Sequence, residues 1–564
     1  MKKMISIMLI CAFVLITVYP VLVKGTSILG ENNNAIEPSS MNTIQYVIIT
    51  TDNLKDSILP LKTWKEYLGY TLEIVTVSWI TDTYTGTDLQ EQIRNFLIDK
   101  YDDWKINYVL IIGSRNSIPM RICHPIPSIY PDSLETDYYY SDLTGNWDAD
   151  QDGYYGEYID DNVDFVSELS IGRIPSDDPE TVSSICKNII LFESDSGEWK
   201  KHALLLGAVI YYENLESFDW VYERSDGATV METCCSDIFE PHGFSCTRMY
   251  EADGLRPSTY TYDYPLERST VISEWQKGYG IVNMLGHSNE KLASRLIWNH
   301  DDGDEIPEMS EGELIYRDIL RSTDAGQLSM ERPPIVFSAG CSQLHTSSNM
   351  GRRFMESSAA VAYIGSTDLG FYNITRVWRD ESDGGAFSLD YYFFDYLIND
   401  NESCGDALSH AKQMFLKRFM FTTYNPDWIY RCYSTLYGFT LYGDPSLGLF
   451  NEKKDENPPI ITLARPKNCV YIFDKEISFL TLPNPFIIGG ITFNVTALDT
   501  ESEVNHVEIW INDVLTQDVS NNQVTWFWDE NVVGRYHFRI VAYDVTGNSA
   551  SYEKDVMIFN FNIF

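Results

Sequence analysis

Residues 46–113 alternate between strand and helix patterns, and this alternation limits the possible folds more than any other feature of the sequence. Runs of consecutive apolar residues mark the strands, and apolar residues at every third or fourth position mark the helices. Thr87 and Gln90 have the spacing of a capping box at the start of the second helix. The predicted elements are strand 46–50, helix 54–69, strand 71–80, helix 87–101 and strand 108–112. This order predicts a parallel sheet flanked by helices.

The same alternation resumes after an irregular stretch at 124–162 that is rich in Tyr and Asp. The simplest division of this region is into two αβα subdomains, residues 44–195 and 200–450. The further elements predicted here are strand 165–171, helix 179–192, and strands 203–211, 280–285, 334–339 and 361–364.

The character of the sequence changes at the Pro458-Pro459 pair. Residues 458–564 contain only strand patterns, which turn residues separate at the spacing of a β-sandwich. Cys469 is the only cysteine in this segment, so the inter-sheet disulfide of antibody domains cannot form. The predicted fold is therefore α/β, with two parallel-sheet subdomains followed by an all-β immunoglobulin-like sandwich.

The chain is strongly acidic. Its 564 residues include 41 Lys and Arg against 82 Asp and Glu, which gives a formal net charge of −41 at pH 7. Proteins bind nucleic-acid phosphates with clustered basic side chains, and no basic stretch occurs after the first three residues. We therefore expect no nucleic-acid partner, and we expect no organic cofactor.

The N-terminus has the pattern of a secretory signal peptide. Lys2 and Lys3 precede an apolar run from Met4 to about Val23. Removal of residues 1–25 as a signal peptide would give a secreted or cell-surface protein. The run is also long enough to span a bilayer, so an uncleaved anchor is the alternative. Nine of the ten cysteines follow the signal, and this odd number leaves at least one thiol unpaired.

Two reactive side chains directly follow buried strands. His287 ends the segment Gly-Ile-Val-Asn-Met-Leu-Gly-His, and Cys341 ends the segment Pro-Ile-Val-Phe-Ser-Ala-Gly-Cys. In open parallel sheets, active sites collect at the carboxyl ends of the strands. A Cys and a His at that edge can form a nucleophile–base pair. The structural alternative is that Cys341 is a buried small residue and His287 a core or capping histidine.

These two segments resemble the caspase–legumain–gingipain clan of cysteine peptidases, and other segments resemble the gingipain family within it. The similarity spans about 46–447 and follows the family's order. It implies caspase-like subdomains, with 200–450 catalytic, and a secreted cysteine endopeptidase that cleaves proteins or peptides through an acyl-enzyme. The further segments are Tyr46–Thr50, Leu61-Lys-Thr-Trp-Lys65, 137–142 leading into Asn146-Trp-Asp-Ala-Asp150, Ile171-Gly-Arg-Ile-Pro175 and Leu441-Tyr-Gly-Asp-Pro-Ser446.

The resemblance also implies roles for individual residues. Cys341 would be the nucleophile and His287 the general acid and base. Glu168 is matched to the acidic residue that orients the histidine in the family. The backbone N–H of Cys341 and one near His287 would hold the oxyanion, so the expected backbone site consists of Gly286, Ser288 and Gly340.

Two positions depart from the family pattern. The family usually has Gly after the histidine, whereas this chain has Ser288, which could narrow the oxyanion hole. Gly340 precedes Cys341 at a position where Ala is commoner. The best-known members cleave after Arg or Lys, and a basic P1 residue would suit the acidity of this chain. The sequence does not single out one carboxylate for such a pocket.

A calcium site is expected in the Asp-rich stretch. Asp148, Asp150 and Asp152 have the alternating spacing of D-x-D-x-D-G, which directs carboxylates at one hard cation. The twelfth position, where an EF-hand has its bidentate Glu, is an isoleucine, and Glu157 or Asp160 would replace it in an irregular loop. Gingipain-like proteins bind structural calcium. The alternative is a solvated acidic turn.

Two other functions remain as alternatives. A non-catalytic surface or adhesion protein with the same fold is suggested by Ser288 and by the immunoglobulin-like segment, which would associate with a cell surface. The short interval before the first strand, which lacks the long pro-segment of gingipains, points the same way. A sortase-like transpeptidase would instead resolve the acyl-enzyme with an amine rather than with water.

Overall fold

The structure is a computed structural model, and it describes residues 44–561 apart from 131–132, 217–222, 372–377, 421–424, 451–457, 500–503 and 545–547. The predicted signal peptide, residues 1–25, lies outside the described residues. None of the helices in the described part is long and apolar enough to cross a bilayer.

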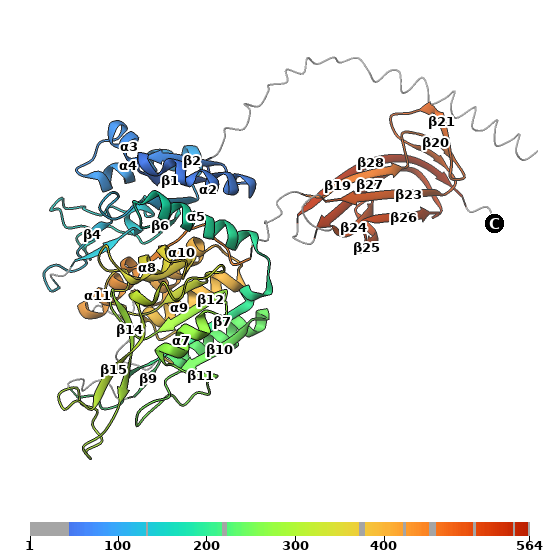
Figure 1. The fold of residues 1–564 in the computed structure, drawn as a ribbon. Coiled ribbons are helices and arrows are strands. Elements are labelled where there is room, and N and C mark those ends of the chain that lie inside the picture. Colours follow the sequence, from blue (N-terminus) through green and yellow to red (C-terminus); the bar gives the residue numbers. More distant parts are fainter. Residues whose placement is uncertain are drawn as a thin grey trace, which may run out of the picture.

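One eleven-stranded sheet forms the centre of the α/β region (Figure 1). Its neighbouring strands are parallel, except for the antiparallel pair of β17 and β18. The sheet therefore consists of two parallel halves that run in opposite directions. The order is β11 (Tyr264–Pro265), β10 (Ser245–Tyr250), β7 (His202–Gly207), β12 (Ile281–Leu285), β16 (Ile335–Ser338), β17 (Ala362–Ser366), β18 (Phe439–Tyr442), β6 (Ser170–Ile174), β3 (Tyr108–Ile112), β1 (Tyr46–Thr50) and β2 (Leu72–Thr76).

The α/β prediction is confirmed, and the two segments 44–195 and 200–450 turn out to share this one sheet. β18 belongs to the second segment in sequence, yet it lies beside β6 of the first. The remaining strands of the α/β region form short antiparallel pairs. These are β4 (Arg121–Cys123) with β5 (Leu134–Thr136), β8 (Val209–Tyr211) with β9 (Ser225–Asp226), and β13 (His287–Ser288) and β15 (Leu314–Arg321) on either side of β14 (Leu292–Trp298).

Some predicted boundaries are wrong, for local reasons. The strand expected at 71–80 ends at Thr76, because the Thr76 hydroxyl accepts from Trp79 N and starts a helix. The strand expected at 165–171 begins only at Ser170, since Phe165 has a φ of 57° and cannot continue an extended strand. The N-cap expected at Thr87 is Asp88 instead, one residue later.

Helices cover both faces of the sheet. Successive side chains of a strand point to opposite faces. Phe337 of β16 contacts Phe393, whereas Tyr363, which pairs with Val336, contacts Phe354. The helices that carry Phe354 and Phe393 therefore lie on opposite faces. The helices are α2 (Lys55–Tyr67), α3 (Val77–Thr83), α4 (Leu89–Trp104), α5 (Pro179–Ser194), α6 (Ala228–Cys234), α7 (Arg268–Trp275), α8 (Met350–Glu356), α9 (Gly385–Phe394), α10 (Cys404–Phe415) and α11 (Pro426–Gly438).

The segments that resemble the family meet in buried ionic clusters. Lys65 Nζ lies 2.6 Å from Glu193 Oε1 and 2.9 Å from Asp444 Oδ2, and all three side chains are buried. Tyr46 donates to Asp444 Oδ1 at 2.8 Å. This cluster joins the first strand, α2 and the turn after β18. Its contacts require residues that are far apart in sequence, which gives a physical reason for these segments to occur together in one chain.

A second buried ion pair holds the middle of the sheet. Arg173 of β6 binds the Asp137 carboxylate at 2.6 and 2.7 Å, and its guanidinium also donates to Gly113 O. The neighbouring Gly172 has no room for a side chain, because a Cβ there would overlap Gly443 O. The Gly-Arg pair therefore lets β6 and the turn after β18 approach closely.

Residues 458–561 form an all-β unit, as predicted, in which two sheets share one core. Phe493 of the smaller sheet packs against Phe538 of the larger sheet, with ring centroids 4.5 Å apart. The immunoglobulin topology itself stays a prediction. The smaller sheet is β19 (Ile460–Arg465), β23 (Ile491–Leu498) and β26 (Gln523–Trp528). The larger is β21 (Lys475–Thr481), β20 (Cys469–Ile472), β22 (Phe486–Ile488), β28 (Ser549–Asn560), β27 (Val532–Asp544), β24 (Val504–Ile511) and β25 (Val514–Val519).

Candidate active site

His287 and Cys341 follow two adjacent strands of the sheet. β12 and β16 are parallel neighbours, and each residue lies just beyond the carboxyl end of its strand. The two turns touch directly, since Ser288 Oγ donates to Cys341 O at 2.8 Å. Both reactive side chains are half-buried. The structure thus brings together the two residues that the strand-end argument singled out.

A backbone carbonyl holds the imidazole of His287. Its Nε2 lies 2.8 Å from Ile210 O in the middle of β8. Because a carbonyl only accepts, Nε2 carries the proton and Nδ1 remains as the basic nitrogen. The rings of Tyr211 and Tyr316 stand nearly perpendicular to the imidazole, each with centroids 5.5 Å away. Burial lowers the pKa of His287, so the ring is neutral at pH 7.

Cys341 has the surroundings of a neutral thiol. Burial raises its pKa above the ordinary value, a backbone hydrogen bond with Gly370 lowers it, and the charge of Asp368 raises it again. Sγ lies 3.9 Å from Gly370 O. Of the seven free cysteines in the described residues, Cys341 alone is not buried, and a disulfide joins Cys235 to Cys246. The accessible unpaired thiol expected from the odd cysteine count is therefore Cys341.

Glu168 does not reach His287, which corrects the role assigned to it. Its carboxylate accepts from Leu143 N at 2.5 Å and from Thr144 Oγ1 at 2.8 Å. It precedes β6, and three strands separate β6 from β12, which at the usual spacing is about 19 Å. The Ile210 carbonyl occupies the position next to the imidazole instead. No sequence signal could have identified it, because every residue carries such a carbonyl.

The three residues expected in the backbone site surround the two turns. Gly286 is tightly packed, since a Cβ there would lie 2.9 Å from Ser294 O. Within the described residues, the N–H groups of Gly340 and Cys341 donate to no acceptor. Two unpaired donors beside a nucleophile are what an oxyanion requires. Ser288 faces the backbone of Cys341 through its hydroxyl.

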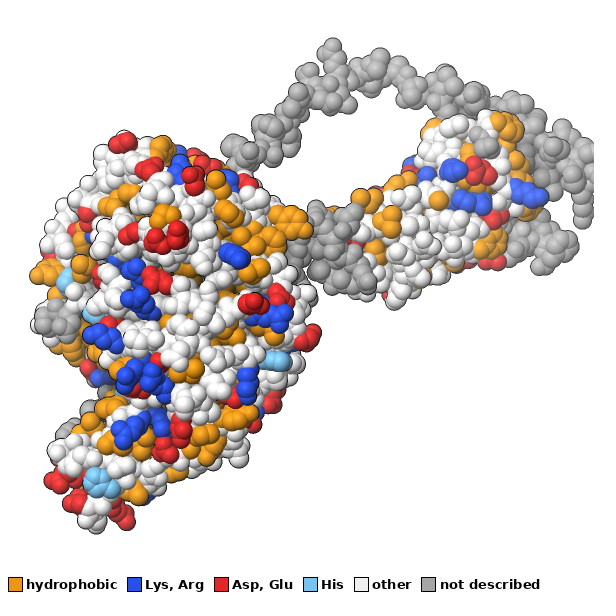
Figure 2. All heavy atoms as spheres, in the orientation of Figure 1, with side chains coloured by type: hydrophobic (Ala, Val, Ile, Leu, Met, Phe, Trp, Pro, Cys, Tyr) orange, Lys and Arg blue, Asp and Glu red, His pale blue; other side chains and the backbone are white. Residues whose placement is uncertain are grey.

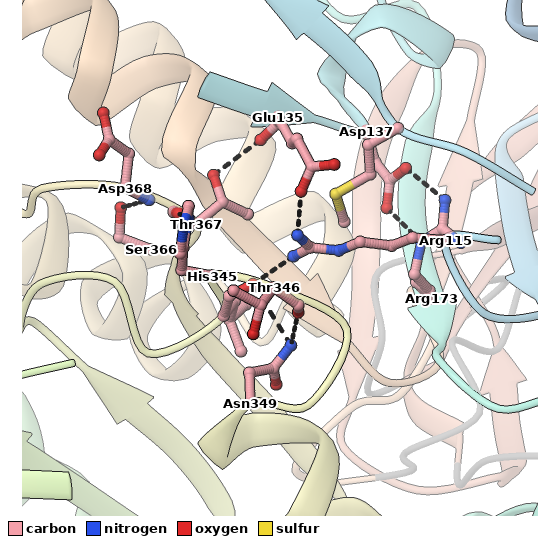
Figure 3. A network of polar contacts seen from close by, with 12 residues as sticks. Arg115, Glu135, Asp137, Arg173, His345, Thr346, Asn349, Ser366, Thr367 and Asp368 are labelled. Atoms are coloured by element: carbon pink, nitrogen blue, oxygen red, sulfur yellow. Dashed lines mark hydrogen bonds and ion pairs between the residues drawn. The ribbon is translucent and has the colours of Figure 1, made fainter. Parts of the chain in front are cut away.

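Contacts from the first segment of the chain fix the turn that follows Cys341 (Figure 3). The Arg115 guanidinium donates to Leu344 O and pairs with the Glu135 carboxylate. Thr367 Oγ1 donates to Glu135 O at 2.7 Å, and Asn349 Nδ2 donates to Leu344 O at 3.3 Å. The nucleophile turn is therefore held by residues that lie about 230 positions earlier in the sequence (344 − 115 = 229). Sequence patterns gave no indication of this contact.

A buried carboxylate that the sequence did not single out lies beside β8. β9 pairs with β8 and places Asp226 opposite Val209, one residue from the carbonyl that holds His287. Asp226 Oδ1 accepts from Ala228 N at 3.0 Å, and Oδ2 accepts from Ser258 Oγ at 2.8 Å. Burial raises the pKa of Asp226. A cationic group bound nearby would offset that cost of burial.

The Asp-rich stretch has the donors of a cation site. Asp148, Asp150 and Asp152 each place a carboxylate oxygen within 4.8 Å of the others. Glu157 is buried, and its Oε2 has no hydrogen-bond partner among the described residues. Burial, followed by the charges of Asp152 and Asp161, raises the pKa of Glu157 to about 7. An unpartnered buried carboxylate oxygen beside three further carboxylates fits a hard cation such as calcium.

A second acidic group lies at the tip of the α/β region. Figure 2 shows acidic side chains gathered there, where the loop between β14 and β15 ends the molecule in Figure 1. Asp301, Asp302 and Asp304 have carboxylate oxygens within 4.8 Å of one another. These side chains are half-buried or exposed, and no buried unpartnered oxygen points into the group in this part of the described chain. The fit to a cation is therefore poorer than at Glu157.

Comparisons with known proteins agree with this fold. The model of peptidase family C25 matches residues 39–450. The crystal structure of the Arg specific cysteine proteinase gingipain R is 15% identical, covers 92% of this chain and 99% of its own, and has a TM-score of 0.51. The complex of the Porphyromonas gingivalis RgpB pro- and mature domains is 15% identical, covers 91% and 100%, and also has a TM-score of 0.51. No curated protein sequence matches the chain.

Proposed function

The chain belongs to peptidase family C25, and on this premise we propose that it is a cysteine endopeptidase with Cys341 as nucleophile and His287 as general base and acid. One observation carries the proposal: the two residues lie just beyond the carboxyl ends of adjacent parallel strands, and Ser288 Oγ donates to Cys341 O across the turns. The half-buried free thiol and the fixed tautomer of the imidazole support it. The substrates of such a family are proteins or peptides.

The proposed reaction begins from a neutral thiol and a neutral imidazole. The Cys341 proton moves to His287 Nδ1 while sulfur attacks the carbonyl carbon of the scissile bond. The oxyanion accepts from the N–H groups of Cys341 and Gly340, which have no acceptor within the described residues. Nδ1 then gives its proton to the leaving amine, which leaves a thioester. Water attacks the thioester carbon as Nδ1 takes one of its protons. The carbon–sulfur bond then breaks, the product leaves as a carboxylic acid, and Nδ1 returns the proton to Cys341 Sγ.

The Ile210 carbonyl has a defined part in this scheme. It accepts a hydrogen bond from Nε2–H throughout, and this keeps Nδ1 free to exchange protons in the reaction. When the ring becomes cationic, the same carbonyl dipole stabilises the charge. A carbonyl stabilises a cationic imidazole less strongly than a carboxylate would. This is consistent with a resting state in which both Cys341 and His287 are neutral.

We further propose that the peptidase prefers a basic residue at P1, with Asp226 as the carboxylate that binds it. The support is the position of Asp226 beside β8 and its burial, which raises the pKa of its carboxyl group although the charge of Arg224 lowers it. Asp226→Asn keeps the size and shape of the side chain but loses the charge. We expect kcat/KM for an Arg substrate to fall about 100-fold relative to a neutral P1 substrate. The exposed Asp263→Asn variant is the matched control. An unchanged ratio would refute the assignment.

Structural calcium is part of the proposal. Asp148, Asp150, Asp152 and Glu157 would hold the ion, and the cation would neutralise carboxylates that otherwise repel one another. Its contribution would be to fix the loop around Trp147, which packs against Tyr437 of α11 with ring centroids 5.2 Å apart. No step of the reaction depends on it.

We also propose that the protein is secreted or held at a cell surface. The Lys-Lys head and the apolar run of residues 1–25 support export. Residues 458–561, which have a core of their own, would mediate surface association.

Cleavage of a mixed peptide library tests the proposed function. Protein 26–564 with calcium and a mild reductant is incubated with the library, and mass spectrometry maps the cleaved bonds. We expect cleavage by the wild type and none by Cys341→Ala. Cys432→Ala, the same change at a buried thiol of α11, should retain activity and serves as the control. Cleavage that persists in Cys341→Ala, or no cleavage by the folded wild type, would refute it.

A further inference from the structure

We propose that Ser288 and Gly340 are one matched pair, in which Ser288 is a positioning residue that fills the space of the missing Cβ at 340 and holds the backbone of Cys341. The claim that Ser288 positions Cys341 for catalysis rests on the function proposed above. The claim that Ser288 and Gly340 pack together does not. Both residues depart from the family pattern, and the sequence alone presents them as two separate departures.

The pairing follows from the space around Gly340. A Cβ built there would overlap Ser288 Oγ, and it would also lie 2.8 Å from Gln343 Nε2 and 2.9 Å from Gly286 O. Real Cβ atoms essentially never approach other atoms this closely. The hydroxyl of Ser288 makes the closest of these approaches, so with serine at 288 only glycine fits at 340.

The hydroxyl of Ser288 also makes contacts that a Cβ at 340 could not. It donates to Cys341 O at 2.8 Å and accepts from Gln343 Nε2 at 3.0 Å. Gln343 Nε2 in turn lies 2.5 Å from Ser338 Oγ at the end of β16. These bonds link the histidine turn, the cysteine turn and the strand that leads to the nucleophile.

The peptide group after Cys341 is held at both of its ends. Ser288 Oγ binds its carbonyl, and the following N–H of Ser342 donates to Asp368 O at 2.7 Å. Ser342 has a φ of 53°, in the left-handed region, which a non-glycine residue adopts only when its surroundings fix it. The clamp fixes the orientation of Cys341 and thus of the N–H that would hold the oxyanion. Ser288 then supports the oxyanion site instead of narrowing it.

A double-mutant cycle tests the pair. The proteins are the wild type, Ser288→Gly, Gly340→Ala and the double variant, with Ser288→Ala added to separate the hydroxyl from side-chain size. Each is assayed for melting temperature, for the rate at which iodoacetamide alkylates Cys341, and for kcat and KM on a peptide that the wild type cleaves.

We expect Gly340→Ala to lower the melting temperature and to reduce kcat about 100-fold, because the overlap displaces the nucleophile turn. The double variant should recover part of both losses, since its new Cβ meets no hydroxyl and keeps only the closer approaches to Gln343 Nε2 and Gly286 O. Ser288→Gly and Ser288→Ala should each reduce kcat about tenfold while KM stays unchanged, which is the signature of positioning rather than of substrate binding.

Additive effects would overturn the pairing: Gly340→Ala would then be equally harmful in the wild-type background and in the Ser288→Gly background. Coupling in melting temperature together with a normal kcat in Ser288→Ala would overturn the positioning role. Melting temperature and alkylation need no peptidase activity. Coupling in these two measurements, in a protein that cleaves no peptide, would therefore refute the proposed function and leave the packing pair intact.

Discussion

Among the individual side chains, His287 and Cys341 both lie in surroundings that favour their uncharged forms. Burial lowers the pKa of the imidazole and raises the pKa of the thiol. A thiolate–imidazolium pair would require the opposite shifts. The reactive thiolate is therefore formed only as the proton moves to Nδ1, and not beforehand.

Alkylation of Cys341 should follow this raised pKa. We expect the rate with iodoacetamide to keep rising with pH beyond about 8.5, the ordinary thiol pKa, and to show no plateau between pH 5 and 8. The rate is measured by mass spectrometry of the Cys341 peptide, with the buried free cysteines as internal controls. A plateau with a midpoint below pH 7 would mean that an ion pair exists in the resting protein.

At the scale of single residues, the sequence predicted only those functional groups that are side chains in a recognisable local pattern. His287 and Cys341 were predictable because a reactive residue directly follows an apolar strand in each case. Glu168 was misassigned, because a carboxylate near a strand looks the same whichever strand it accompanies. Ile210 acts through its backbone, and Asp226 is one of 82 acidic residues. Pairing of β8 with β9, which brings both near the site, leaves no local pattern.

Among the elements, α2 and the turn after β18 are joined by the buried cluster of Lys65, Glu193 and Asp444. Burial of charges is tolerated only when each is paired, and removal of one partner leaves the others uncompensated. The strand and helix patterns predicted both elements but not this contact, since the two segments are almost 400 residues apart (444 − 65 = 379).

Lys65→Met should destabilise the protein by about 3–5 kcal/mol, because it leaves two buried carboxylates unpaired. Urea denaturation, followed by tryptophan fluorescence, measures the change. Lys62→Met is the matched control on the same helix: Lys62 is partly exposed and pairs with Glu66, so we expect a loss of about 1 kcal/mol or less. Equal losses in the two variants would show that the cluster is not important for stability.

The loop around residues 148–157 should show linked dependence on calcium and pH. The pKa of Glu157 is raised to about 7 in the folded protein without metal, from about 4.5 when unfolded. The protonated Glu157 carboxyl is compatible with its burial, so the folded protein is most stable with respect to this group below pH 4.5. As the pH rises to 7 the carboxyl must ionise in its buried position, and this part of the stability is lost. Calcium should remove this loss, because the bound ion stabilises the ionised carboxylate.

Thermal unfolding at pH 5 and pH 8, with EDTA or with calcium, checks this prediction. We expect calcium to raise the melting temperature at pH 8 in the wild type but not in Glu157→Gln. The exposed Asp103→Asn variant is a distant control for loss of one negative charge. If calcium stabilises Glu157→Gln as much as the wild type, Glu157 is not a ligand.

For the whole molecule, the alternation of strands and helices predicted the α/β region and the all-β segment, and both are confirmed. The reversal of direction between β17 and β18 was not predictable, because apolar strands that are buried on both faces carry no mark of their neighbours. Residues of 44–195, Arg115 among them, contact the turn after Cys341.

Covalent labelling with a peptidyl acyloxymethyl ketone tests the central claim, that Cys341 is a nucleophile assisted by His287. Intact mass and peptide mapping locate the adduct on the wild type, Cys341→Ala and His287→Ala. We predict one adduct per molecule on Cys341 in the wild type, none in Cys341→Ala, and labelling slowed about 100-fold or more in His287→Ala. An adduct on another residue, or equal labelling rates with and without His287, would contradict the account.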